Sequence, residues 1–318
     1  MRALVCEVFG ARPVVREVDV PAVRPGFVLV RTQHSSVCAG DLLMVNGRPW
    51  LFRPVFTAML GRPAVLGRDM AGVVEAVGDG VEGLSVGDSV IGEAGGAWAE
   101  QVLVPADACA RVPAGVDLRE AGTLPVSGLT ALQGIRDAGR VQEGSRVLVV
   151  GASGGVGHFA VQIATALGAR VTGVCSAAKA ERVRELGAVD VIDHTRERFV
   201  DRRGAFDAVL DLSGAEPIGA CLQTLAPGGV YVSSAGSNGG WLAGPLPRLL
   251  AAALRSLVDR SVVVLTTQAN RADLTTLVQS LAEGRLRPWI GTDTHLAGLP
   301  TVLEHYGSHQ GKIAVDLR

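Results

Sequence analysis

The segment VVGASGGVG, residues 149–157, begins at the end of the predicted strand RVLVV (146–150), whose last four residues are branched and apolar, and opens a stretch with helical apolar spacing at 155–167. Glycines in such a turn let the backbone approach a pyrophosphate without a Cβ clash, and the start of the helix offers free N–H groups to the anion. A tight turn without a ligand would also use glycine, but the strand before it and the helix after it favour a bound dinucleotide. We therefore expect contacts to a dinucleotide from Ser153, Gly154, Gly155, Val156 and Gly157.

Apolar runs alternate with amphipathic stretches in the residues that follow. The sequence predicts helices at 155–167 and 177–186 and strands at 146–150, 171–174, 189–192, 207–212, 230–234 and 262–266. Nearly continuous apolar strands separated by helices indicate a parallel sheet covered on both faces. Residues 122–266 are therefore predicted to form a doubly wound Rossmann domain within an α/β protein.

The N-terminal region has a different pattern. Up to about residue 118, short alternating segments are broken by Gly and Pro, which predicts a β-rich lobe. The segment 47–63 has large apolar residues between prolines and is interpreted as a loop. After a helix at 271–283, short strands at 286–296 and 312–317 suggest a return to the first lobe, so we divide the chain into residues 1–121, 122–266 and 267–318.

Composition excludes several classes of partner. Of 318 residues, 30 are Lys or Arg and 31 are Asp or Glu, and this balance provides no field for nucleic acid or an anionic membrane. Five scattered cysteines without a CxxC pair predict neither a disulfide framework nor a four-cysteine zinc lobe, and they favour a reducing compartment. Because the first residues lack the apolar run of a signal peptide, we expect a cytoplasmic protein.

The end of the strand at 171–174 indicates which dinucleotide is bound. Binders of an unphosphorylated dinucleotide usually place an acid there for the ribose 2′-hydroxyl, whereas here Ser176, Lys179 and Arg182 follow. A hydroxyl and cations suit a 2′-phosphate, which an acid would repel. NADPH is therefore the predicted cofactor, although a solvated helix position would account for Lys179 on its own.

Motifs along essentially the whole chain resemble those of zinc-independent medium-chain dehydrogenases/reductases of the quinone-oxidoreductase type. They include SSVCAGDLLMVNG (35–47), VLGRDMAGVVEAVGDGV (65–81), GAWAEQVLVPAD (96–107) and GKIAV (311–315). The resemblance implies a GroES-like catalytic lobe built from both chain ends, an inserted dinucleotide domain and a cleft between them.

The resemblance also implies roles for single residues. Ser176 and Lys179 match the family's 2′-phosphate site, and His194 stands where many members have a tyrosine beside the adenine ribose. Lys312 falls where relatives reach the cofactor phosphates or the nicotinamide ribose. The positions that face the nicotinamide half of the cofactor are matched by Thr130, Ser213, Gly214, Ala235 and Gly236.

Zinc members of the superfamily bind their metal through a Cys, the His of a Gly-His-Glu triplet and a later Cys. In this chain Cys38 remains, but the triplet is Gly67-Arg68-Asp69 and residues 124–127 hold no ligand. A guanidinium in the place of a coordinating imidazole disfavours Zn²⁺. No metal is therefore expected, and Arg68 and Asp69 are expected to pair with each other.

Without a Lewis acid, the acceptor must already be electrophilic, as a quinone or an α,β-unsaturated carbonyl is. Related enoyl reductases often have a tyrosine as proton donor near the loop after Gly47, but the two tyrosines here are Tyr231 and Tyr306. The catalytic candidates are Asp41, which would orient substrate or water or else cap the following turn, and Cys38, for which a buried packing role is the alternative.

Two apolar segments, 50–60 and 241–250, would form a wall for a flat or extended acceptor if the family architecture holds. Arg53 and Arg248 would then lie at its mouth, either binding an acidic tail or standing in solvent. The substrate-binding residues expected in this wall are Trp50, Phe52, Phe56 and Trp241.

The predicted strand at 261–266 is uncharged and β-branched, and as a sheet edge it predicts a homodimer formed by pairing of edges. The leading hypothesis for function is an NADPH-dependent reductase of quinones or conjugated carbonyls. An enoyl-thioester reductase, a non-redox biosynthetic enzyme and a non-catalytic dinucleotide-binding protein are the alternatives, because one fold hosts many functions.

Overall fold

The computed structural model describes residues 1–48, 50, 53–60, 64–234 and 246–318. The chain forms two compact units, of which the first combines Met1–Leu129 with Gln268–Arg318 and the second is Thr130–Thr267. We call these unit 1 and unit 2. The C-terminal segment thus belongs with the N-terminal region, and the change between units falls at Thr130 rather than at residue 122.

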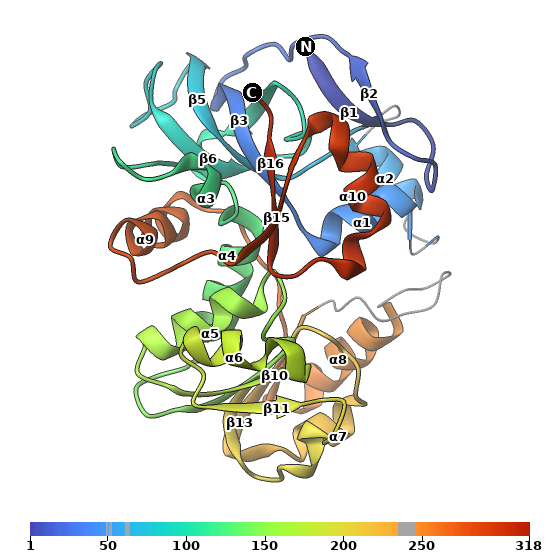
Figure 1. The fold of residues 1–318 in the computed structure, drawn as a ribbon, viewed down its shortest axis with the longest axis vertical. Coiled ribbons are helices and arrows are strands. Elements are labelled where there is room, and N and C mark those ends of the chain that lie inside the picture. Colours follow the sequence, from blue (N-terminus) through green and yellow to red (C-terminus); the bar gives the residue numbers. More distant parts are fainter. Residues whose placement is uncertain (49, 51–52, 61–63, 235–245) are drawn as a thin grey trace. The chain divides into compact units, whose positions relative to one another are not determined.

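The strands of unit 1 form two sheets. The larger has the order β15-β16-β3-β5-β6-β8, with β7 also paired to β3, and the smaller has the order β2-β1-β4. The strand β16 lies between β15 and β3, so the C-terminal segment completes the N-terminal sheet (Figure 1). The bounds are β1 Arg2–Cys6, β2 Val14–Glu17, β3 Phe27–Val37, β4 Ala64–Val65, β5 Asp69–Val77, β6 Ser89–Glu93, β7 Gln101–Pro105, β8 Cys109–Arg111, β15 Ile290–His295 and β16 Lys312–Asp316.

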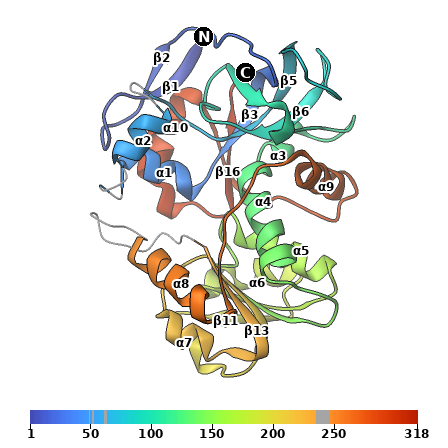
Figure 2. The ribbon, with the colours of Figure 1, turned by 180° about the vertical axis from the view of Figure 1, so that it is seen from behind.

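Helices occupy the connections of unit 1. The helix α9, labelled in Figure 2, packs against β8. The helix α4 begins in unit 1 and ends in unit 2. The α-helices are α1 Ala39–Asn46, α2 Arg53–Leu60, α3 Leu118–Ala121, α4 Pro125–Leu132, α9 Arg271–Ala282 and α10 Leu299–Glu304. Short 3₁₀ helices are η2 Ala106–Ala108, η5 Leu296–Gly298 and η6 Tyr306–Ser308.

The interpretation of residues 47–63 as a loop is wrong for 53–60, which form α2. Pro54 stands in the first turn of that helix, where a missing N–H breaks no helical hydrogen bond. The proline that suggested a loop is therefore compatible with the helix.

Trp98 lies at the centre of one core cluster of unit 1 and is fully buried. Its indole Nε1 donates to the carbonyl of Ser36, 3.2 Å away. Gly67 has a φ of +93°, and a Cβ on it would lie 2.5 Å from the Trp98 ring. Glycine is thus required at the first position of the 67–69 triplet, and this turn aims the next two side chains.

Unit 2 is built on one parallel sheet with the order β11-β10-β9-β12-β13-β14. The strands are β9 Arg146–Val150, β10 Arg170–Cys175, β11 Asp190–Asp193, β12 Phe206–Asp211, β13 Leu225–Ser233 and β14 Val262–Val264. Its helices are the π-helical η3 Gln133–Ala138, α5 Gly157–Ala166, α6 Ala177–Glu185, the 3₁₀ helix η4 Phe199–Asp201, α7 Ile218–Leu222 and α8 Leu246–Val258.

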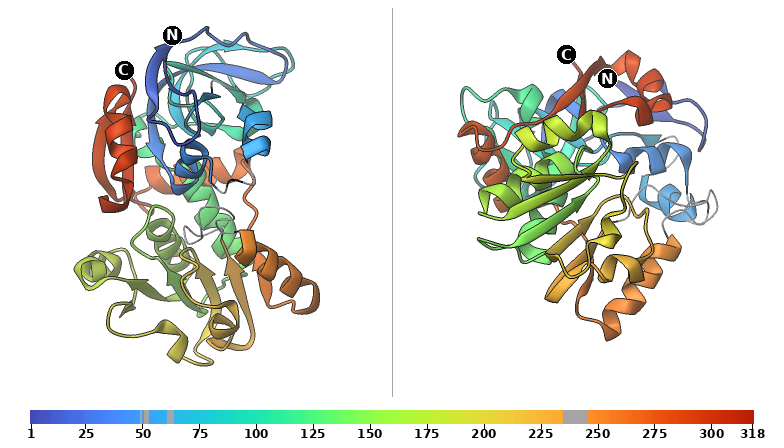
Figure 3. Two further views of the ribbon diagram at one scale, coloured as in Figure 1. Left: turned by 90° about the vertical axis from the view of Figure 1, so that its right-hand side faces the viewer. Right: turned by 60° about the horizontal axis from the view of Figure 1, so that its bottom comes forward.

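The strand order explains how this sheet is covered. Right-handed crossovers put α5 and α6 on one face, and the reversal of direction after β11 puts α8 on the other (Figure 3). The predicted doubly wound architecture is confirmed. The carboxyl ends of β9, β10 and β12 meet at one edge, where such sheets bind ligands.

Candidate functional site

The glycine-rich loop of unit 2 lies between β9 and α5. Gly151 has a φ of +87°, and its carbonyl accepts from the amide of Gly154 at 3.0 Å. A Cβ on Gly157 would lie 2.1 Å from the Gly151 carbonyl oxygen, so only glycine closes this turn. The amides of Gly155 and Val156 precede α5 and face the place where an anion binds at a helix N-terminus. The loop thus fits a dinucleotide pyrophosphate.

Ser176, Lys179 and His194 come together at the carboxyl ends of β10 and β11. Ser176 caps α6, its carbonyl accepts from the amide of Lys179 at 2.9 Å, and the amide of His194 bonds to the Cys175 carbonyl at 3.1 Å. Among the residues that the structure describes, Lys179 has no ion pair, whereas Arg182 is paired with Glu185 at 2.7 Å. Lys179 is therefore the cation still available for a 2′-phosphate.

Asp193 also lies at this edge and was missed by the sequence reasoning. Its carboxylate accepts from the amide and the hydroxyl of Thr195, and these bonds lower its pKa. The guanidinium of Arg196 lies 3.6 Å away. The negative charge of Asp193 is thus already partly compensated, and the acid holds the turn that carries His194.

The turn Ser213-Gly214 after β12 is held by Asp211. One carboxylate oxygen accepts from the amides of Ser213 and Gly214 at 3.0 and 2.9 Å. The other accepts from the Tyr231 hydroxyl at 2.8 Å and from Arg248 at 2.7 Å. This network gives the expected nicotinamide-side turn a rigid support within unit 2.

Arg248 does not stand in solvent as one sequence interpretation had it. Its side chain is 15% exposed, bonds to Asp211 and donates to the carbonyl of Glu216 at 2.6 Å. Arg248 also donates to the hydroxyl of Tyr231 at 2.6 Å. Since its charge is compensated by Asp211, Arg248 is a structural cation rather than a group free to bind an acidic tail.

Of the remaining residues predicted to contact cofactor or substrate, the structure describes Thr130 and Trp50. The hydroxyls of Thr130 and Thr267 lie 3.4 Å apart within unit 2. Trp50 is about half exposed and stacks on the guanidinium of Arg53, which is 4.4 Å from the ring. Phe52, Ala235, Gly236 and Trp241, as well as the side chain of Phe56, lie outside what the structure describes.

Arg53, which was predicted to lie at the mouth of the apolar wall, makes contacts with the end of α1 and with Trp50. Its Nε donates to the carbonyl of Gly47 at 3.0 Å, where α1 has ended. Cations near a helix C-terminus satisfy its free carbonyls. Arg53 therefore connects the start of α2 to the end of α1.

In unit 1, Cys38 and Asp41 form a capping box at the start of α1. The amide of Cys38 donates to Asp41 Oδ2 at 2.8 Å, while Asp41 Oδ1 is buried without a partner among the described residues. Burial, chiefly, raises the pKa of Asp41 to about 6. Burial and the nearby Asp41 and Asp69 raise the pKa of Cys38, so its thiolate is disfavoured. The capping role of Asp41 is thus present, and its second oxygen remains free.

Arg68 does not pair with Asp69, so this expectation is wrong. Its Nη2 bonds to Glu93 across the β5–β6 pair, while Nη1 lies 3.3 Å from where a Cβ would stand on Gly40. Burial opposes its charge, but Glu93, Cys38 and Asp41 outweigh that and raise the pKa of Arg68. A fixed positive charge therefore stands beside Cys38 and Asp41.

Asp69 pairs instead with Lys312, from the C-terminal strand. The ammonium lies 3.2 Å from Asp69 Oδ2 and donates to the Ser127 hydroxyl at 2.9 Å, and both charged side chains are 1% exposed. Asp69 also accepts from the Ser36 hydroxyl and from the amide of Val126. The charge of Lys312 is thus already paired inside unit 1, and the expectation that Lys312 contacts the cofactor stays a prediction.

Tyr306, which the sequence separates from the catalytic candidates by more than 260 residues, belongs to the same region of unit 1. It packs against the cluster that contains Val37 and Val45, on either side of Cys38 and Asp41. Burial, then the charges of Cys38 and Asp41, raise the pKa of its hydroxyl. Tyr306 lies near Cys38 and Asp41 because the C-terminal segment returns to unit 1, which the sequence around Tyr306 does not indicate.

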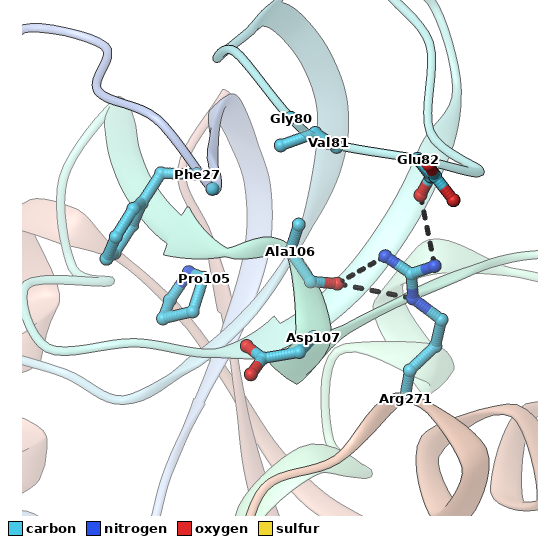
Figure 4. Close-up of a pocket in the computed structure, with 9 residues that line it drawn as sticks. Phe27, Gly80, Val81, Glu82, Pro105, Ala106, Asp107 and Arg271 are labelled. Atoms are coloured by element: carbon cyan, nitrogen blue, oxygen red, sulfur yellow. Dashed lines mark hydrogen bonds between the residues drawn. The ribbon is translucent and has the colours of Figure 1, made fainter.

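A separate pocket of about 700 Å³ lies on unit 1 (Figure 4). The guanidinium of Arg271 enters it from the start of α9 and donates to the carbonyls of Glu82, Ala106 and Cys109. These bonds attach α9 to the β-rich part of the unit. The lining residues include none of the clusters above, and we assign no ligand to this pocket.

The ranges that the structure describes contain no group of three or more His, Cys, Asp or Glu side chains arranged to hold a metal ion. No helix in these ranges has the length and apolar character needed to cross a membrane.

Comparison with known proteins identifies the family. Residues 24–114 match the alcohol dehydrogenase GroES-like domain, and residues 155–283 match the family described as zinc-binding dehydrogenase. A chloroplast envelope quinone oxidoreductase homolog from Arabidopsis thaliana is 32% identical over 241 residues, which cover 71% of each chain. The chain belongs to the quinone-oxidoreductase-like medium-chain dehydrogenases/reductases.

Further similarities agree with this assignment. The quinone oxidoreductase from Coxiella burnetii has a TM-score of 0.87 at 26% identity, covering 100% of this chain and 99% of that one. An acryloyl-coenzyme A reductase from Sulfurisphaera tokodaii is 29% identical over 245 residues, which are 67% of this chain and 71% of that protein. The chain also matches part of the pikromycin polyketide synthase component PikAII from Streptomyces venezuelae, at 39% identity over 192 residues, and spans only 5% of its length.

The predicted family resemblance and fold class are thus confirmed. The glycine loop between β9 and α5 fits the nicotinamide dinucleotide on which dehydrogenases of this family depend.

Proposed function

We propose that this protein uses NADPH to reduce a quinone or an α,β-unsaturated carbonyl without a metal ion. The observation that carries the proposal is Arg68 beside Cys38, where zinc-dependent relatives would need an imidazole ligand. A guanidinium repels a metal ion, so the acceptor has to be electrophilic by itself. Quinones and conjugated carbonyls meet that requirement.

The choice of NADPH rests on the carboxyl end of β10. Ser176 stands where an acid would bind a 2′-hydroxyl, and Lys179 has no ion pair among the described residues. Asp193 is the nearby acid: its Oδ1 accepts from Thr195, and Arg196 lies 3.6 Å from its Oδ2, which has no hydrogen-bond partner among the described residues. A 2′-phosphate would therefore meet an uncompensated ammonium and a hydroxyl.

Replacing Lys179 by alanine tests this cofactor assignment. We expect Lys179→Ala to weaken NADPH binding by about 1.5–3 kcal/mol and to leave NADH binding nearly unchanged, because NADH has no 2′-phosphate. Titration of the protein's fluorescence with each cofactor measures both affinities. Arg182→Ala is a matched control on the same helix, since Arg182 is paired with Glu185. Equal loss for both cofactors in Lys179→Ala would contradict the assignment.

When bound, the reduced nicotinamide supplies the hydride. The residues of unit 2 bind and orient it: the glycine loop receives the pyrophosphate, and the Asp211 network holds the turn at Ser213-Gly214. In unit 1, Asp69 and Lys312 hold β5, β16 and the start of α4 together, so the backbone that carries Arg68 is rigid. Protonation of the reduced product falls to solvent, or to Asp41 or Tyr306, whose protonated forms are favoured by burial.

The second candidate is reduction of an enoyl thioester, and the specific observation behind it is the similarity to an acryloyl-coenzyme A reductase. The same electrophilic carbonyl chemistry serves both classes, and a thioester adds a long polar tail. NADPH oxidation measured against quinones, enones and enoyl thioesters separates them. Elemental analysis of chelator-free protein should show no stoichiometric zinc, and one tightly held zinc per chain would contradict the metal-free proposal.

We also propose a homodimer formed by unit 2. β14 is the last strand of its sheet, and α8, which packs against it, leaves Leu250, Leu254, Leu257 and Val258 more than half exposed. An uncharged sheet edge beside an exposed apolar helix stripe favours pairing with a second copy. Light scattering at micromolar concentration should therefore give the mass of a dimer.

A further inference from the structure

Arg68 has hydrogen-bonding capacity that the fold does not use. Among the described residues it bonds to Glu93 through Nη2, while Nε and Nη1 have no acceptor. A guanidinium carries five N–H donors in a rigid plane, so most of them remain available. The side chain is 31% exposed, which leaves these donors accessible from solvent.

The surroundings hold the guanidinium in one place. Glu93 fixes one end of the group from β6, and Gly40, at the start of α1, lacks the Cβ that would crowd Nη1. Cys38 Sγ lies near the same point, 3.8 Å from the position of that absent Cβ. Arg68 is thus a positioned cation with free donors beside Cys38 and Asp41, and all three lie in the part of the chain that matches the GroES-like domain.

We propose that Arg68 binds the carbonyl oxygen of the acceptor and stabilises the negative charge that develops on it. This inference rests on the proposed function. When hydride leaves a C–H bond of the reduced nicotinamide and adds to the β-carbon of an α,β-unsaturated carbonyl, the C=C π pair shifts to the bond between the α-carbon and the carbonyl carbon, and the C=O π pair moves onto the oxygen. The acceptor is thereby reduced to an enolate with its charge on that oxygen, the nicotinamide is oxidised, and a proton from water later adds to the α-carbon. In a quinone the charge collects on oxygen in the same way, so one donor group serves both acceptor classes.

The free donors of Arg68 are suited to this role because a fixed hydrogen-bond donor aimed at developing charge lowers the barrier without reorganisation. In zinc-dependent relatives the metal polarises the oxygen, and here a guanidinium stands at the position of one of its ligands. The replacement would remove the metal while keeping a positive charge for the oxygen. The acceptor must then present an oxygen that the guanidinium can reach. Arg68 would not accelerate the reduction of hydrocarbon acceptors or of one-electron metal complexes, because no negative charge develops on such an oxygen in them.

Arg68→Gln and Arg68→Lys test the proposal, with Arg119→Gln as the matched control. Arg119 is also in unit 1, is 36% exposed and is paired with a carboxylate, that of Asp293. For a series of quinones whose hydroquinones differ in acidity, we expect Arg68→Gln to lower kcat by about 10²-fold, with the loss growing as the product oxygen becomes more basic. Arg68→Lys should recover part of this loss, since it keeps the charge and the pairing with Glu93. Both cofactor affinities should stay unchanged in all three variants.

A binding measurement without cofactor gives an independent readout. We expect 2,6-dinitrophenolate, a stable anion that resembles the reduced oxygen, to bind about 10-fold more weakly to Arg68→Gln than to the unchanged protein, while neutral nitrobenzene binds both equally. A loss that is uniform across the quinone series, or the same in Arg119→Gln, would overturn the proposal. If the unchanged protein reduces none of the acceptors, the proposed function fails, and the phenolate measurement still decides whether Arg68 is an oxyanion site. If Arg68→Gln does not fold, Arg68→Lys carries both measurements.

Discussion

Asp69 in unit 1 and Asp211 in unit 2 are both buried carboxylates that bind a cation from a distant segment, but their partners differ. Asp69 joins Lys312, the Ser36 hydroxyl and the Val126 amide. Asp211 binds the amides of its own following turn, and then Tyr231 and Arg248. Both serve the rule that a buried charge must be paired and fully hydrogen-bonded.

The difference shows how each unit is held together. Around Asp69 the partners come from β3, α4 and β16, so its loss would remove a side-chain link between the N-terminal and C-terminal parts of unit 1 in addition to the β3–β16 ladder. Around Asp211 two of the donors are local amides, which would stay in place if Arg248 were removed. The ammonium of Lys312 is also more deeply buried than the guanidinium of Arg248, at 1% against 15% exposure. We therefore expect removal of the cation to lower the unfolding free energy more in unit 1, at Lys312, than in unit 2, at Arg248.

The largest effect is predicted for Lys312→Met. It leaves the buried Asp69 carboxylate without its cation, and breaking a buried pair in this way costs about 3–5 kcal/mol of unfolding free energy. Urea denaturation, followed by circular dichroism, measures the loss. The double variant Lys312→Met with Asp69→Leu should recover part of it, because no unpaired charge remains. A loss below about 1 kcal/mol for the single variant would mean that the Asp69–Lys312 pair does not hold the two ends of unit 1 together.

Asp41 sharpens the comparison, because it is buried without a cation bonded to it. Its pKa is raised to about 6 by burial, while Arg68 and the bond from the Cys38 amide act to lower it and Asp69 acts to raise it. The folded protein therefore binds the proton more tightly than the unfolded chain, and the contribution of Asp41 to stability falls as the pH rises from about 4 to 6. We expect the unfolding free energy of Asp41→Asn, relative to the unchanged protein, to rise by about 2.5 kcal/mol between pH 4 and pH 7.

Denaturation of both proteins at several pH values measures this difference. Asparagine can still accept from the Cys38 amide through its side-chain oxygen, so the capping bond is kept. Asp41→Ala, which loses the cap as well, is the control for that bond. A difference that does not change with pH would show that the Asp41 carboxyl titrates as it does in the unfolded chain.

A smaller effect, about 2 kcal/mol, is predicted for Arg248→Met. Asp211 would keep the Tyr231 hydroxyl and two backbone amides, and the site is closer to solvent than that of Lys312. The same denaturation experiment measures the loss, and Arg255→Met on the exposed side of α8 is the control. If Arg248→Met proved as costly as Lys312→Met, the local amides would contribute little, and the two networks would be equivalent.

Local sequence was sufficient to predict most of the strands and two of the helices of unit 2. Apolar runs and helical spacing predicted β9 to β12, β14, α5 and α6 to within two residues at each end, because these elements bury one face or both in a regular period. The strand β13 begins five residues before the predicted residue 230, and in unit 1 the helix α9 was predicted equally well. The glycine loop was predicted for the same reason, since its conformation depends on residues that are adjacent in the chain. The helix at 53–60 was missed because prolines at its ends conceal a short helix.

The sequence by itself determined the Rossmann architecture of unit 2, the glycine loop, the absence of an acid at Ser176 and the presence of Arg68 in the triplet. Only the tertiary structure decided that Arg68 pairs with Glu93, that Arg248 pairs with Asp211, and that Lys312 reaches Asp69 across 243 residues of chain. The physical reason is that periodicity reports which face of an element is buried, whereas a buried charge takes its partner from whichever segment the fold brings within about 3 Å. For unit 1 that segment is the returning C-terminal strand, which no local pattern near Asp69 could predict.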